Sequence, residues 1–122
     1  MKKANSFEDV LLVPKYSEIR SRLDVDTRSS LGEGIEFTLP VISSPMDTVT
    51  EQAMASTMNS AGGLGIIHRY NSIEEQAKIV FDTYASGVEH VAAAIGMTGD
   101  YLERAQMLVD AGASILCIDV AH

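Results

Sequence analysis

From Pro40 onward, hydrophobic residues alternate between short continuous runs and longer stretches with helical spacing. The short runs are nearly continuous in apolar residues, which is typical of parallel strands covered on both faces. The stretches between them place apolar residues mostly on one face of a helix. This alternation predicts βαβ units. The predicted strands are Leu39–Ile42, Leu64–Ile67, Val91–Ile95 and Ile115–Ile118.

Polar residues and glycines mark where the predicted helices begin and end. Thr48 with Glu51, and Ser72 with Glu75, have the spacing of a capping box, in which two side chains satisfy free N–H groups of the first turn. Asp100 is a weaker cap candidate before the third helix. Glycines stand where each helix is expected to end, because a left-handed residue costs least there. These glycines are Gly62, Gly63, Gly87 and Gly112.

The repeat length favours one α/β architecture. Consecutive predicted strands end 25, 28 and 23 residues apart, and the units of a (β/α)8 TIM barrel average roughly 31 residues. We therefore expect residues 40–122 to form about the first four strands of such a barrel, with an open doubly wound sheet as the alternative. Residues 1–39 lack this pattern and are expected to form a lead-in with short hairpin segments, packed across one end of the barrel. Because no helix follows the fourth run, we expect the chain to be part of a longer barrel.

Composition and charge narrow the classes of function. The 122 residues are 46% hydrophobic, which suits one globular domain. A net charge of −8 disfavours binding to nucleic acid or to an acidic membrane surface. No apolar run approaches the ~20 residues of a membrane span. We do not expect the N-terminal segment to be a secretory signal, because no apolar core follows its two lysines. A single cysteine, Cys117, suits a reducing compartment, so we expect a cytoplasmic protein that acts on small molecules.

Polar residues follow each predicted strand, where parallel α/β folds collect ligands. Ser44 leaves the first strand just before a helix N-terminus and is a candidate for anion binding, with a turn satisfied by hydroxyl groups as the alternative. Met46 suits either core filling or an apolar wall under a flat ring. His68 and Arg69 follow the second strand and are candidates for nucleotide contact, with a structural hydrogen-bonding role for His68 as the alternative.

Asp119, at the end of the fourth strand, is the most suggestive single residue. A carboxylate there is suited to accept two ribose hydroxyls, and capping of nearby backbone N–H groups is the alternative. Together with His122 it supplies too few ligands for a metal site. Cys117 falls within an apolar strand, where burial is expected to raise the pKa of its thiol and make it a poor nucleophile. We therefore predict no metal site.

Five ordered motifs make nearly the whole chain similar to the inosine monophosphate (IMP) dehydrogenase and guanosine monophosphate (GMP) reductase family. They occupy residues 7–14, 43–51, 62–68, 93–96 and 118–122. The resemblance implies a (β/α)8 barrel, usually assembled as a tetramer, that performs hydride chemistry on a purine nucleoside monophosphate with a nicotinamide cofactor.

The resemblance also assigns roles to individual residues. It implies that Ser44 and Met46 contact the purine nucleotide, and that Asp119 binds a ribose of the cofactor. Three further residues are expected near the rest of the cofactor: Arg69, Met97 and Thr98.

Two activities remain open within the resemblance. A dehydrogenase converts IMP, NAD and water into xanthosine monophosphate (XMP) and NADH through a cysteine thioimidate, whereas a reductase converts GMP and NADPH into IMP and ammonia. About ten residues separate Val80 from Val91, which excludes the regulatory modules that most dehydrogenases carry there. Pro45 favours the dehydrogenase, and residues 119–121 favour the reductase. We expect a dehydrogenase that uses NAD, with a reductase that uses NADP as the alternative.

The catalytic cysteine of that family, its phosphate-binding glycine loops and its monovalent-cation site belong to the second half of the barrel. We therefore predict no catalytic residue within this chain, and no activity for the 122 residues alone. A third hypothesis, from another class, is a non-catalytic half barrel that pairs with itself and binds nucleotide through Ser44 and Asp119.

Overall fold

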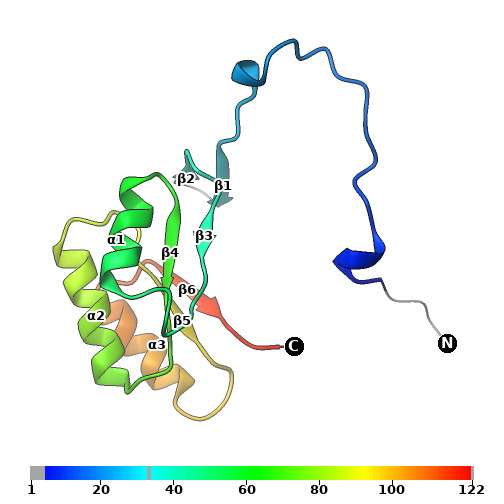
Figure 1. The fold of residues 1–122 in the computed structure, drawn as a ribbon. Helices are drawn as coiled ribbons and strands as arrows, with labels where there is room; N and C mark the ends of the chain where they lie inside the picture. Colours follow the sequence, from blue (N-terminus) through cyan, green and yellow to red (C-terminus); the bar gives the residue numbers. More distant parts are fainter. Residues whose placement is uncertain (1–4, 33, 122) are drawn as a thin grey trace.

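The computed structural model describes residues 5–32 and 34–121, and its main body is a parallel sheet with helices packed on one face (Figure 1). The strands pair in the order β3-β4-β5-β6, and every pairing in this sheet is parallel. The strands are β3 (Ile42–Ser43), β4 (Leu64–Ile67), β5 (Ala92–Ile95) and β6 (Ile115–Ile118). The helices are α1 (Gln52–Ser60), α2 (Ile73–Ala85) and α3 (Tyr101–Asp110).

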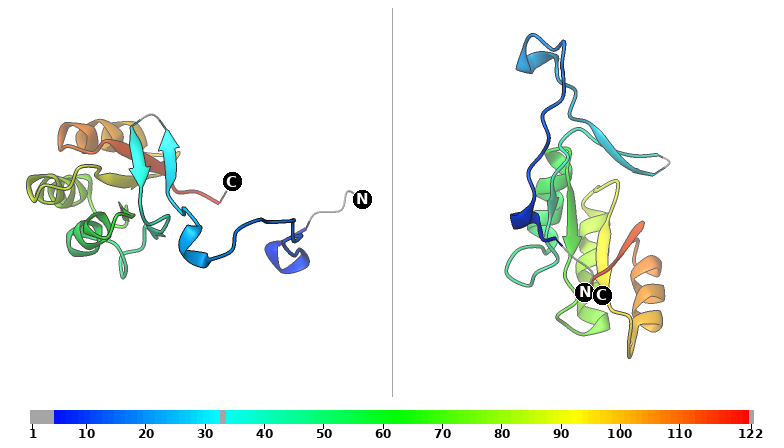
Figure 2. Two further views of the ribbon diagram at one scale, coloured as in Figure 1. Left: turned by 90° about the horizontal axis from the view of Figure 1, so that it is seen from above. Right: turned by 90° about the vertical axis from the view of Figure 1, so that its right-hand side faces the viewer.

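This arrangement confirms the predicted parallel α/β architecture. Strands that are consecutive in sequence are neighbours in the sheet, and α1, α2 and α3 cover the same face (Figures 1 and 2). A doubly wound sheet reverses its strand order at a switch point and carries helices on both faces. The described part of the chain has neither property, so the order of its strands disfavours that alternative.

Three of the four predicted strands lie where the apolar runs placed them. β4 and β6 have the predicted bounds, and β5 begins one residue later than predicted. The first strand is shorter and later than the run at residues 39–42 suggested. Pro40 has no N–H to donate, and the Val41 N–H donates to the Leu39 carbonyl at 2.8 Å in a tight bend. The extended pairing therefore starts only at Ile42.

The three predicted helix starts have different outcomes. The capping box of α2 is confirmed, because the Ser72 N–H donates to Glu75 Oε2 at 3.0 Å and the Glu75 N–H donates to Ser72 Oγ at 3.2 Å. The predicted box at Thr48 and Glu51 is wrong: Thr48 lies in a turn and α1 begins only at Gln52. α3 begins after Asp100 as predicted, but the Asp100 side chain does not cap it.

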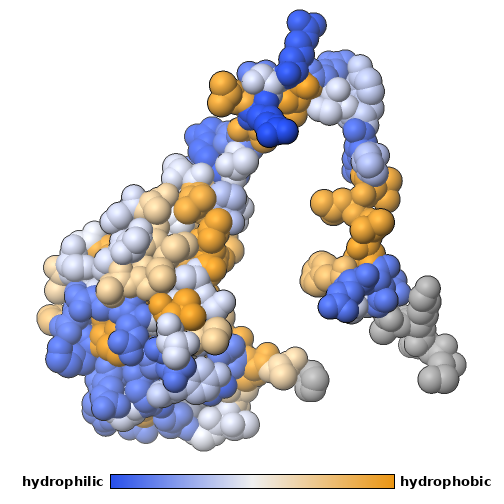
Figure 3. Space-filling view, in the orientation of Figure 1, coloured by the Kyte–Doolittle hydropathy of each residue, from blue (hydrophilic) through white to orange (hydrophobic). Residues whose placement is uncertain are grey.

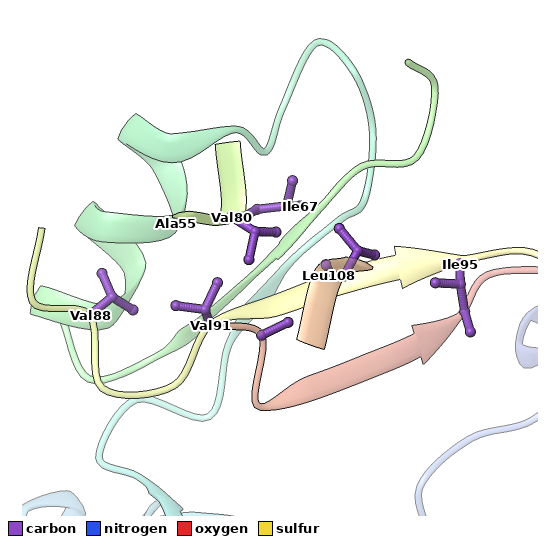
Figure 4. Packing of buried hydrophobic residues seen from close by; sticks show 9 residues of the cluster. Ala55, Ile67, Val80, Val88, Val91, Ile95 and Leu108 are labelled. Carbon is purple, nitrogen blue, oxygen red and sulfur yellow. The ribbon is translucent and has the colours of Figure 1, made fainter. Parts of the chain in front are cut away.

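The core lies between the helices and the sheet. Ile67 of β4, Val80 of α2 and Leu108 of α3 face it and are fully buried (Figure 4). Ala93 of β5 is fully buried in the same cluster. A second cluster covers the opposite face of the sheet, where Phe37 packs against residues at the amino ends of β4 and β5. The hairpin that carries Phe37 therefore covers the end of the sheet opposite to the strands' carboxyl ends.

The lead-in contains the hairpin that was expected there. β1 (Ser29–Gly32) pairs antiparallel with β2 (Ile35–Phe37). Residues 5–28 form an exposed arm that runs away from the sheet and includes two short 3-10 turns, η1 (Phe7–Asp9) and η2 (Arg22–Asp24) (Figures 1 and 2). Hydrophobic side chains lie along this arm (Figure 3), among them Leu12 at 97% exposure. Packing of residues 1–39 on one end of a complete barrel stays a prediction.

A close approach of α1 to β4 depends on Gly65. A Cβ atom on this residue would lie 2.6 Å from the Cα of Ala55, which is buried in α1. We expect Gly65→Ala to lower the free energy of unfolding by about 1–3 kcal/mol, because the helix must move away from the sheet. Urea denaturation measures this loss. Ala53→Ser adds one atom on the exposed side of α1 and should change stability by less than about 0.5 kcal/mol; equal effects of the two substitutions would contradict the prediction.

Candidate functional site

The loop between β3 and α1 presents two of the predicted substrate residues. Both Ser44 and Met46 are exposed. The Ser44 carbonyl accepts hydrogen bonds from the Met46 N–H at 2.9 Å and from the Thr50 hydroxyl at 2.7 Å. Thr50 is fully buried, and its Oγ1 also lies 2.8 Å from Ser43 Oγ. The loop is thus held by its backbone and by Thr50, a residue that the sequence pattern did not single out.

Arg69 and Asp119, predicted as separate cofactor contacts, lie side by side. Arg69 follows β4 and Asp119 follows β6, and the Arg69 Nη2 donates to the Asp119 carbonyl at 3.0 Å. Arg69 Nε also lies 3.5 Å from Asp119 Oδ2, and about one third of each side chain is exposed. The guanidinium passes over the intervening strand, since a Cβ on Gly96 would lie 3.5 Å from Arg69 Nη1. The carboxyl ends of three strands therefore meet at this pair.

Within this pair, the Asp119 carboxylate keeps hydrogen-bonding capacity for a ligand. Arg69 Nε is buried and has no hydrogen-bond partner among the described residues. The Asp119 N–H donates to the Ile95 carbonyl at 3.0 Å, which fixes the backbone after β6. No capping of a backbone N–H by the Asp119 carboxylate is found within residues 5–32 and 34–121, so the carboxylate retains free lone pairs.

The remaining predicted cofactor residues lie on the neighbouring loop. Met97 and Thr98 are exposed in the connection between β5 and α3, which begins at Gly96. The four predicted cofactor residues thus follow β4, β5 and β6, and the two predicted substrate residues follow β3. All six lie after the carboxyl ends of adjacent parallel strands.

The contacts of His68 are those of a structural hydrogen-bonding residue, the alternative to nucleotide contact. The side chain is only 3% exposed. Its Nδ1 accepts a hydrogen bond from the Tyr70 N–H at 3.1 Å, so in the neutral ring Nε2 carries the proton and donates to Glu51 Oε1 at 3.0 Å. The carboxylate that was expected to complete a capping box is thus used to hold a buried imidazole at the start of α1.

An open pocket of about 430 Å³ lies beside His68, between the loop that precedes α1 and helix α2. Its walls include Asp47, Tyr70 and Glu75. None of the six predicted ligand contacts lines it. The candidate site is therefore the open surface at the carboxyl ends of the strands rather than this pocket.

A buried polar network behind the strand ends was missed by the sequence analysis. Arg104 of α3 is only 8% exposed, and its Nη1 donates to Gln76 Oε1 at 2.8 Å. Its Nη2 donates to Asp100 Oδ2 at 2.9 Å, and this bond lowers the pKa of the Asp100 carboxyl. The spacing of four residues between Asp100 and Arg104 was the one available signal. Nothing in the helical pattern marked Gln76 as a buried partner.

Cys117 has the raised thiol pKa that was expected of it, although it is less buried than expected. The residue is half-buried in β6, where burial, together with the negative charge of Asp119, raises the pKa of its thiol. A raised pKa leaves little thiolate at neutral pH, so this cysteine is a poor nucleophile.

Within the described ranges, no group of three His, Cys, Asp or Glu side chains is placed to hold a metal ion. His122 lies outside those ranges. None of the described helices is long and apolar enough to cross a membrane.

Comparison with known proteins gives a consistent match. The family model described as "IMP dehydrogenase / GMP reductase domain" matches residues 4–122. Inosine-5'-monophosphate dehydrogenase of Nitrosopumilus maritimus is 50% identical over 86 residues, which are 70% of this chain and 18% of that protein. GMP reductase of Leishmania donovani is 47% identical over 75 residues, which are 62% of this chain and 15% of that protein.

A third relative aligns with almost the entire chain. Inosine-5'-monophosphate dehydrogenase of Cryptosporidium parvum is 33% identical over 162 residues, covering 98% of this chain and 40% of that protein. The chain thus spans less than half the length of the curated relatives it matches. With a family model matched over residues 4–122, and parallel strands at the predicted places, the chain belongs to the IMP dehydrogenase / GMP reductase family.

Proposed function

We propose that this chain supplies the first half of a (β/α)8 barrel in a purine nucleotide oxidoreductase of the IMP dehydrogenase type. In this proposal the reaction is the oxidation of IMP by NAD and water to XMP and NADH. The observation that carries the proposal is the pairing of Arg69 with Asp119 at three strand ends, beside the loop that presents Ser44 and Met46. Strands outside this chain close the barrel, and residues 1–39 pack on one end of it.

The Arg69–Asp119 pair suits the ribose of a nicotinamide cofactor. Asp119 is one third exposed and meets Arg69 at one carboxylate oxygen, so acceptor positions remain for two ribose hydroxyls. The guanidinium of Arg69 lies 3.5 Å from one carboxylate oxygen and orients the carboxylate. When bound, the nicotinamide accepts the hydride. Arg69 and Asp119 bind and orient the cofactor and do no covalent chemistry themselves.

The β3–α1 loop suits the purine nucleotide. The exposed Ser44 hydroxyl is available as a hydrogen-bond donor, and the exposed Met46 side chain offers a polarisable apolar surface for a flat ring. Thr50 holds the backbone between them, so both side chains are presented from a fixed loop. The nucleophilic cysteine of the reaction belongs to residues outside this chain, because Cys117 is half-buried with a raised thiol pKa.

The direct test assays the protein as its gene encodes it. We expect IMP with NAD to form NADH, followed as a rise in absorbance at 340 nm. Oxidation of NADPH by GMP, without oxidation of IMP, would replace the dehydrogenase with the reductase, an alternative that has support in the 47% identity to the Leishmania donovani protein. Nucleotide binding with neither reaction would favour the non-catalytic half barrel.

A chimeric enzyme tests whether this segment can supply its half of the site when a second half of the barrel is present. Residues 40–121 would replace the corresponding segment of the Bacillus subtilis inosine-5'-monophosphate dehydrogenase, to which this chain is 53% identical over 79 residues. We expect the graft to oxidise IMP with NAD. A folded graft that binds neither ligand would overturn the proposal.

A further inference from the structure

A buried guanidinium connects the two loops that carry the candidate cofactor residues. Arg104 lies between α2 and α3 and is only 8% exposed. Its Nη2 donates to the Asn71 carbonyl at 3.2 Å, two residues after Arg69, and to Asp100 Oδ2 at 2.9 Å, two residues after Thr98. One side chain thus bridges the β4–α2 loop and the β5–α3 loop.

The same side chain also reaches the strand between them. Arg104 Nη1 donates to Gln76 Oε1 at 2.8 Å, and Gln76 Nε2 donates to the Ala94 carbonyl at 2.8 Å. Gln76 is fully buried, and its amide has one orientation here because the guanidinium only donates and the carbonyl only accepts. Ala94 is two residues before Gly96, over which the Arg69 guanidinium lies. The network therefore fixes the backbone beneath the candidate site.

A buried cation is a poor source of stability. Removing a guanidinium from water costs free energy that its partners only partly return, and well-packed apolar residues often serve as well or better in such places. The five donors of arginine, in contrast, hold several acceptors at fixed angles. Arg104 uses them on one residue from each loop and on the helix residue that binds β5. The contacts are those of a side chain that sets the geometry of two loops.

We propose that Arg104 is a positioning residue for cofactor binding, which holds the β4–α2 and β5–α3 loops so that Arg69 and Thr98 meet the cofactor together. This inference rests on the proposed function of the site. The inference predicts different effects on the two ligands, because the β3–α1 loop that presents Ser44 lies outside the network of Arg104. Loss of Arg104 therefore weakens the binding of NAD and leaves the binding of IMP intact.

The test compares three variants of the protein, as its gene encodes it, with the wild type. Arg104→Met removes the guanidinium and keeps much of its volume, and Arg104→Lys keeps the charge but cannot reach all the acceptors at once. Lys78→Met removes an exposed cation from α2, where Lys78 pairs with Asp82, and is the matched control. Isothermal titration calorimetry gives the Kd of NAD and of IMP, and hydrogen exchange reports the amides of residues 70–71 and 97–99.

We expect Arg104→Met to raise the Kd of NAD at least tenfold, to leave the Kd of IMP within twofold, and to speed exchange in both loops. Arg104→Lys should lie between this variant and the wild type, and Lys78→Met should match the wild type. Equal weakening of both ligands, or unchanged exchange in both loops, would overturn the inference. If Arg104→Met does not fold, Arg104→Lys decides by the same criteria.

Hydrogen exchange tests the positioning role of Arg104 independently of the proposed function. If the wild-type protein, as its gene encodes it, binds no NAD, this contradicts the proposed function. In that case, faster exchange confined to the two loops of Arg104→Lys still supports the positioning role, and exchange equal to that of the wild type contradicts it.

Discussion

Asp119→Ala is expected to cause the largest loss of activity among single substitutions in this chain, when the chain is part of a complete barrel. The carboxylate would accept two ribose hydroxyls, and hydrogen bonds to a charged group contribute about 1.5–3 kcal/mol each. Losing both corresponds to a decrease of about 100-fold or more in kcat/KM for NAD. Steady-state kinetics with varied NAD at saturating IMP measures this decrease.

The control for Asp119→Ala is Asp110→Ala. Asp110 is an exposed carboxylate at the end of α3, so the substitution removes the same group at a distance from the strand ends. It should leave kcat/KM for NAD within about twofold, as expected for a surface position. An unchanged KM for NAD in a folded Asp119→Ala protein would show that the ribose is held by other residues.

Leu108→Ala is expected to have the largest effect on stability. Leu108 of α3 is fully buried (Figure 4) and belongs to the same hydrophobic cluster as Ala93 and Ile95 of β5. Replacing a buried leucine by alanine costs about 2–5 kcal/mol, because apolar contacts are lost and a cavity remains. A typical domain has about 5–15 kcal/mol of stability in total. Urea denaturation followed by circular dichroism should show a large decrease in midpoint.

Leu102→Ala is the matched control, since Leu102 lies on the same helix and is 69% exposed. This substitution should change the free energy of unfolding by less than about 0.5 kcal/mol. Similar losses for Leu102 and Leu108 would mean that α3 packs on the sheet through a different face.

Local chemistry explains which elements of the fold were predictable. The run at residues 64–67 carries no polar side chain, follows two glycines and ends at the polar His68, so its bounds follow from the pattern alone. Ser72 and Glu75 satisfy each other within one helical turn. Glu51 has the same spacing from Thr48, but its carboxylate bonds to His68, 17 residues away. A tertiary contact of this kind outweighs a local rule and leaves no trace in the sequence pattern.

The candidate site was predictable in position and not in its contacts. The rule that ligands gather at the carboxyl ends of parallel strands selected Arg69 and Asp119 separately. Their pairing joins residues 50 positions apart and depends on the strand order. Arg104 was missed because a charged residue on an amphipathic helix is expected on the solvent side. Its burial depends on Gln76 and Asn71, which lie on other elements.

The order of the strands also bears on how the chain assembles during synthesis. Each strand pairs with the strand made just before it, and successive strands end at Ser43, Ile67, Ile95 and Ile118. Within the described residues, no strand of this sheet pairs only with a strand that is distant in the sequence. At about 5–20 residues per second, a ribosome releases one such unit of roughly 25 residues every 1–5 seconds. The sheet is therefore suited to grow by one strand and one helix at a time as the polypeptide emerges.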